Sequence, residues 1–193
     1  MRVFLSRSCA LALVAVAVAC GAASTTSSDE AKLAFPQGNN LGYCASNPSP
    51  ECSQGHPVAN KQLVLTFDDG PGSQTSALST WLRGQGIHAT FFELGEYVGS
   101  GSNPILAQLE ADGHLVGNHT WDHPDLTTLS SSQVVDEVSS TDALIAPYVD
   151  QSHFIFRAPY GAWSANDYTA LNGSAMKKYV GPVRWDIGGQ MTS

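Results

Sequence analysis

Short apolar runs alternate with segments of helical periodicity along most of this chain, and this alternation constrains the fold more than any other feature. Residues 62–67 are apolar and β-branched and end in Asp-Asp-Gly-Pro, which is typical of a buried strand that stops at a turn. Residues 73–85 then place apolar side chains at helical spacing, and glycines close the segment. Three aromatic residues of these first elements are expected in the core, namely Trp81, Phe91 and Phe92.

The same order continues toward the carboxyl terminus. Pro104 favours the first turn of a helix that begins near it. Strands and helices that alternate without an internal repeat predict parallel βαβ units, so the expected class is α/β, with either an open sheet or a barrel. Further strands are expected at residues 89–94, 115–118, 154–157 and 179–185, and further helices at 103–112, 130–146 and 164–176.

Polar residues gather where the expected strands end. Asp68 and Asp69 follow the first strand, His119 and His123 follow the third, and Arg157 ends the fourth. Active sites of parallel α/β folds lie at the carboxyl ends of the strands. The sequence therefore predicts one site that contains all of these side chains.

The residue types at this edge predict a metal centre. Asp69, His119 and His123 supply one carboxylate and two imidazoles, a set that leaves coordination positions open on zinc or a similar ion. Asp68 would then accept a proton from water. Pro124 disfavours helical geometry at His123, so we expect a loop with at most one helical turn. The alternative is a buried structural histidine beside a surface histidine.

Arg-Ala-Pro-Tyr at residues 157–160 completes the expected site. Arg157 would pair with Asp68 and hold its carboxylate in one orientation. The backbone N–H near Tyr160 would donate to a developing oxyanion. The alternative interpretation is an ordinary loop arginine followed by a turn proline.

The amino-terminal residues predict an exported protein. Arg2 and Arg7 precede an apolar stretch that is too short to span a membrane, so residues 1–19 are typical of a signal peptide. Cys20 follows directly, which leaves simple cleavage and a lipid anchor at Cys20 both open. The formal net charge of −8 argues against a nucleic-acid partner.

Two regions separate this signal from the expected catalytic domain at residues 61–193. Residues 20–33 have the composition of a flexible tether, and residues 34–60 form an irregular lead-in that contains Cys44 and Cys52. In an oxidising compartment this even pair predicts a disulfide, and the alternative is two unpaired thiols.

Three motifs in one order resemble the NodB homology domain, the polysaccharide deacetylases of carbohydrate esterase family 4. They are Thr-Phe-Asp-Asp-Gly-Pro at residues 66–71, His-Thr-Trp-Asp-His-Pro at 119–124, and Arg-Ala-Pro-Tyr at 157–160. The resemblance covers roughly residues 61–187.

The resemblance implies a distorted (β/α) barrel that removes acetyl groups from N-acetylated polysaccharide such as chitin or peptidoglycan. It implies Asp68 as catalytic base, Arg157 as the residue that orients the base, and Tyr160 as oxyanion donor. Asp69, His119 and His123 would hold the metal, with zinc favoured and cobalt as an alternative.

The carboxyl-terminal part departs from the family pattern. Trp185 and Asp186 resemble only the approach to a fourth motif, and no residue matches the family's general-acid histidine. We therefore expect a fragment of a longer protein, with the barrel incomplete at its carboxyl-terminal end. Two alternative functions stay open: an O-acetyl esterase acting on xylan or cell-wall sugar, and a carbohydrate-binding remnant with impaired catalysis.

Overall fold

A three-stranded parallel sheet forms the centre of the computed structural model, which describes residues 63–99 and 103–185. The strands are β1 (Thr66–Gly70), β2 (Thr90–Glu93) and β3 (Leu115–Asn118), in the order β1-β2-β3. Isolated parallel bridges join Asn118 to Phe156 and Ile155 to Val180, and they continue the sheet beyond β3. The prediction of an α/β fold with parallel strands is confirmed.

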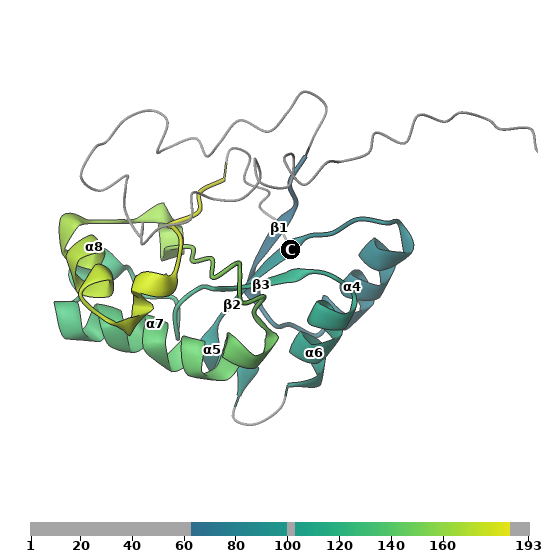
Figure 1. Ribbon diagram of the computed structural model, residues 1–193, viewed down its shortest axis with the longest axis horizontal. Helices are drawn as coiled ribbons and strands as arrows, with labels where there is room; N and C mark the ends of the chain where they lie inside the picture. The colour runs from purple at the N-terminus through teal and green to yellow at the C-terminus, as the bar shows by residue number, and fades with distance from the viewer. Residues whose placement is uncertain (1–62, 100–102, 186–193) are drawn as a thin grey trace, which may run out of the picture. The chain divides into compact units, whose positions relative to one another are not determined.

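Helices connect the strands and pack against them. Figure 1 shows α4 together with α6 on one side of the strands, and α7 together with α8 on the other. The α-helices are α4 (Thr75–Gly84), α5 (Gly95–Val98), α6 (Pro104–Ala111), α7 (Ser131–Ile145) and α8 (Ala165–Asn172). The short 3₁₀ segments are η1 (Leu126–Thr128), η2 (Ala146–Tyr148), η3 (Pro159–Gly161) and η4 (Ala175–Lys178).

The helix ends follow from capping residues in the sequence. The Asn103 side chain accepts hydrogen bonds from the N–H groups of Ile105 and Leu106, which otherwise lack a partner inside α6. Ser130 and Gln133 form a capping box at the start of α7. These caps explain why both helices begin within a residue of the expected position.

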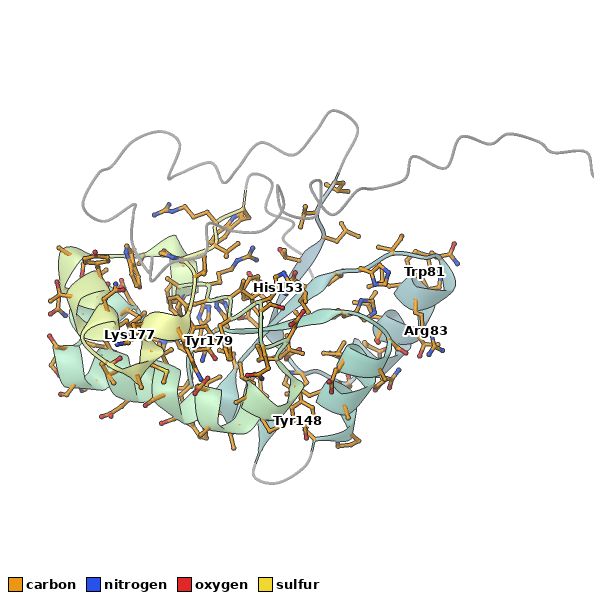
Figure 2. All side chains as sticks on the ribbon, in the orientation of Figure 1. Trp81, Arg83, Tyr148, His153, Lys177 and Tyr179 are labelled. Carbon is orange, nitrogen blue, oxygen red and sulfur yellow. The ribbon has the colours of Figure 1, made fainter. Side chains whose placement is uncertain are left out.

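Two clusters of buried apolar side chains stabilise the two sides of the sheet. Phe91 belongs to the first and Tyr179 to the second. Trp81 was expected in the core, but it is 58% exposed and lies on the outer side of α4 (Figure 2), because Leu82 takes the inward position beside it. The first cluster contains Leu82, Ala89, Phe91, Val98, Leu106, Leu109, Val116, Ile145 and Val149, and the second contains Leu126, Val134, Val138, Phe156, Ala158, Leu171, Met176 and Tyr179.

Three expected elements differ from the structure. The first strand begins four residues later than expected and continues through Gly70, with an irregular register between Phe67 and Gly70. The expected strands at 154–157 and 179–185 are reduced to single bridges, and Pro182 has no N–H with which to extend a ladder. The expected helix at 164–176 ends at Asn172, because Gly173 caps α8 and η4 follows.

Several predictions lie outside the described residues. These are the signal peptide at 1–19, the lipid anchor at Cys20, the tether at 20–33, and the lead-in at 34–60 with Cys44 and Cys52. They stay predictions. Among the helices of residues 63–99 and 103–185, none combines the length and apolar character needed to cross a bilayer.

Candidate metal and catalytic site

Asp68 and Asp69, the two neighbouring carboxylates of β1, have different partners, and the backbone at Asp69 has an unusual conformation. Asp69 has a φ of 64°, the left-handed region that non-glycine residues rarely adopt. The two side chains meet different partners, with Asp68 on Arg157 and Asp69 facing the two histidines. Backbone conformations of this kind occur often at functional sites, where the surrounding fold offsets their cost.

Asp69, His119 and His123 form a compact cluster of potential metal ligands. The Asp69 Oδ1 atom lies 3.4 Å from His119 Nε2 and 3.5 Å from His123 Nε2. The ligand atoms of the three residues all lie within 4.8 Å of one another. One carboxylate oxygen and two imidazole nitrogens around a common point fit a divalent cation such as zinc. The structure thus brings together the three residues that the sequence predicts as ligands.

The surroundings of this cluster favour the unprotonated forms that bind a metal. The neighbouring His119 lowers the pKa of Asp69, although burial opposes this shift. Burial also lowers the pKa of His123, and the nearby His119 acts in the same direction. His119 is 2% exposed, and its Nδ1–H donates to the Arg157 carbonyl at 2.8 Å, which leaves the Nε2 lone pair facing Asp69.

Arg157 holds the other carboxylate from a buried position. Its Nη1 donates to Asp68 Oδ1 at 2.6 Å and to the Thr66 hydroxyl at 2.8 Å, and its Nε donates to the Val183 carbonyl at 3.1 Å. The guanidinium also lies 4.2 Å from the centroid of the Phe92 ring. Burial lowers the pKa of Arg157, and Asp68 opposes this shift. The guanidinium is therefore fixed in one place and presents its charge to Asp68.

Tyr160 borders the site on its exposed side. Its ring centroid lies 4.5 Å from that of His123, and 68% of the residue is exposed. The backbone at Tyr160 also has a left-handed φ, of 58°. The predicted role of its N–H group as an oxyanion donor stays a prediction.

Helix α5, which the sequence pattern does not indicate, supports the segment between the two histidines. The N–H groups of Gly95 and Glu96 donate to the carbonyls of Thr120 and Trp121, each at 3.0 Å. On the preceding side, Asn118 Oδ1 accepts from the Thr120 N–H at 3.0 Å. This support is consistent with the left-handed φ of 72° at Thr120. A helix of only four residues leaves no clear periodicity in a sequence.

Replacing Gly95 with alanine is expected to destabilise the fold by about 1–3 kcal/mol and to weaken metal binding. A Cβ atom at Gly95 would lie 2.5 Å from both Thr141 Oγ1 and Trp121 Cε3, so the indole and its backbone would have to move. Urea unfolding and zinc titration measure the two effects. Gly84→Ala is the matched control, because its Cβ would meet no atom within 4 Å. Equal free energies of unfolding and equal zinc affinities in the two variants would contradict this prediction.

The fold and the cluster together define an α/β protein with a candidate divalent-metal centre at the carboxyl ends of parallel strands. The sequence model of the polysaccharide deacetylase family matches residues 55–177. The chain belongs to this family. The match includes all three motifs and every residue of the cluster described above.

Known relatives resemble this chain over part of their length. A chitooligosaccharide deacetylase of Azorhizobium caulinodans is 36% identical over 128 residues, which cover 65% of this chain and 58% of that protein. A chitin deacetylase of a Pestalotiopsis species is 30% identical, over 84% of this chain and 51% of its own length. The chain thus spans little more than half the length of these relatives.

A solved structure supports the same fold. The family 4 carbohydrate esterase of Streptomyces lividans, determined in complex with acetate, has a TM-score of 0.57 and 33% sequence identity to this protein. The similarity covers 67% of this chain and 65% of that one. The described strands and helices therefore form part of a NodB-type barrel, as the sequence predicts.

Proposed function

We propose that the protein removes acetyl groups from N-acetylated polysaccharide of the chitin or peptidoglycan type, with a divalent cation held by Asp69, His119 and His123. The observation that carries the proposal is the pairing of this ligand cluster with a second carboxylate, Asp68, which a buried arginine orients. Relatives named as chitooligosaccharide and chitin deacetylases support the substrate class. Acetate, present in the related Streptomyces esterase, is the product that this reaction would release.

The chain's own residues divide the chemistry between them. A bound divalent cation would polarise the acetyl carbonyl and lower the pKa of a water molecule. Asp68 lies beside the ligand cluster, where its carboxylate can accept the proton of the attacking water and then return it to the nitrogen that leaves when the C–N bond breaks. Arg157 donates a hydrogen bond to the Asp68 carboxylate and fixes its direction. The N–H of Tyr160 would donate to the oxyanion.

Acetate release tests this proposal. The protein, supplied with zinc or cobalt, is expected to release acetate from N-acetylated chitooligosaccharides, and Asp69→Ala or treatment with a chelator is expected to abolish the reaction. Asp69→Ala removes one of three ligands, so zinc affinity should fall in parallel with the rate. Activity that survives complete metal removal would contradict the mechanism. A strong preference for acetylated xylan would indicate an esterase, and glycan binding without acetate release would indicate a binding protein.

We also propose that the protein is exported, on the strength of the charged and apolar order of residues 1–19. Mass spectrometry of the protein from its native host tests this. The expected mass lacks the first 19 residues, and an added acyl mass at Cys20 would identify a lipid anchor. An intact amino terminus on the recovered protein would contradict export by this route.

A further inference from the structure

The three residues between the two histidine ligands, Thr120, Trp121 and Asp122, are here called the ligand loop. Their backbone sets where His123 lies relative to His119, because no strand or helix includes them. Helix α5 holds the two carbonyl groups of Thr120 and Trp121, as described above. The amide groups on the other side of the loop need a different partner, and α7 provides it.

Glu137 of α7 is that partner. Its Oε2 atom accepts a hydrogen bond from the Trp121 N–H at 2.9 Å and a longer one from the Asp122 N–H at 3.4 Å. Carboxylate acceptors form stronger hydrogen bonds than neutral ones. A single oxygen thus contacts both amides that immediately precede His123. Burial raises the pKa of Glu137, with the N–H of Trp121 opposing this shift, which agrees with its half-buried position against the loop.

Helix α7 is well suited to act as a fixed support. It is capped at its amino terminus, and Val134 and Val138, on either side of Glu137, are fully buried in the second core cluster. One turn farther along, the buried Thr141 packs against Gly95 of α5. The ligand loop is therefore clamped between α5, which binds its carbonyls, and α7, which binds its amides.

We propose that Glu137 is a positioning residue that holds the ligand loop in the conformation in which His119 and His123 converge on Asp69. The inference rests on the proposed metal site and extends it to a residue that binds neither metal nor substrate. Without Glu137, two loop amides lose their acceptor, and the backbone next to His123 gains freedom. A histidine that samples several positions binds a metal more weakly than one that is already in place, because ordering it costs conformational entropy.

Three variants test this inference. Glu137→Ala removes the acceptor, Glu137→Gln keeps an oxygen at the same place, and Asp136→Ala removes an exposed carboxylate from the neighbouring position of the same helix. Affinity for Zn²⁺ and Co²⁺ is measured by competition with a chelator. Removal of a residue that orients a ligand typically weakens metal binding by about 10–100-fold, and this loss is expected for Glu137→Ala. Glu137→Gln should recover much of the affinity, and Asp136→Ala should match the unsubstituted protein.

Hydrogen exchange of the metal-free protein provides a second readout. The amides of Trp121 and Asp122 are expected to exchange faster in Glu137→Ala, while amides in β2 and β3 keep their protection. Uniformly faster exchange would mean that the substitution only loosens the fold, and this would overturn the proposed role. Unchanged metal affinity in Glu137→Ala would overturn it as well.

The proposed metal site is tested separately by the unsubstituted protein. If that protein binds neither Zn²⁺ nor Co²⁺, the proposed function and the role of Glu137 both fall. If it binds them and Glu137→Ala binds equally tightly, only the role of Glu137 falls. The two failures are therefore distinguishable.

Discussion

Asp68→Asn is expected to slow acetate release by about 10²–10⁴-fold while the protein still binds zinc. Asparagine has the shape of aspartate and can still accept the hydrogen bond that Arg157 donates at 2.6 Å, but its amide cannot take a proton from water. The ligand cluster lacks Asp68, so the metal should stay in place. Initial rates on chitooligosaccharides and zinc affinity, measured on the same preparations, separate the two effects.

Asp69→Asn is the matched control, because it makes the same chemical change at the adjacent residue. This variant should lose zinc affinity and activity together, since Asp69 Oδ1 faces both imidazoles. If Asp68→Asn instead loses zinc and Asp69→Asn retains it, the two carboxylates have the opposite roles.

A pH-dependent loss of stability is expected from Glu93, which the mechanism does not use. Glu93 is fully buried at the end of β2, and neither carboxylate oxygen has a hydrogen-bond partner among the described residues. Burial raises the pKa of Glu93 from 4.5 to about 8. Between these values the folded state keeps a proton that the unfolded state loses. The free energy of unfolding should therefore fall as pH rises, by at most about 1.4 kcal/mol per pH unit, and level off above pH 8.

Glu93→Met is expected to remove this dependence and to raise the free energy of unfolding at pH 8 by roughly 2–4 kcal/mol. Methionine is unbranched, so it can follow the path of the glutamate past Gly70, where Glu93 Oε2 packs closely against the backbone. Urea unfolding of the metal-free protein between pH 5 and pH 8, followed by tryptophan fluorescence, measures the effect.

Glu110→Met makes the same substitution at an exposed position of α6 and serves as control. Its free energy of unfolding should depend on pH as that of the unsubstituted protein does. Parallel pH profiles for all three proteins would mean that Glu93 is ionised in the fold, and the prediction would be wrong.

Local sequence patterns predicted those parts of the fold that depend on local chemistry. The bounds of β3 and the ends of α6 and α7 follow from apolar periodicity and capping residues, and the structure agrees with them. The convergence of Asp69, His119 and His123 could also be predicted, because parallel strands present their carboxyl ends at one edge. The resemblance of the motifs to a known family supplied the chemical roles of these residues, and the geometry of the site is compatible with those roles.

Features that depend on contacts between distant segments could not be predicted in this way. Glu137 looks in the sequence like an ordinary polar residue of an amphipathic helix. Only the folded structure shows that it contacts the ligand loop. Glu93 looks like a strand-end carboxylate that should reach water, yet it is completely buried. Trp81 has helical spacing with apolar neighbours but lies on the exposed face, because the inward positions are already filled.

A closed ring of contacts joins the ion-binding and proton-accepting residues. Arg157 binds Asp68 through its side chain and His119 through its carbonyl, His119 faces Asp69, and Asp69 follows Asp68 in the chain. Displacement of any member is transmitted around the ring to the others. Substitutions at Arg157 and His119 should therefore not act independently, and the energetic effect of one should depend on the other. Metal binding and proton acceptance should therefore be lost together, because a change in the position of one set of residues also changes the position of the other.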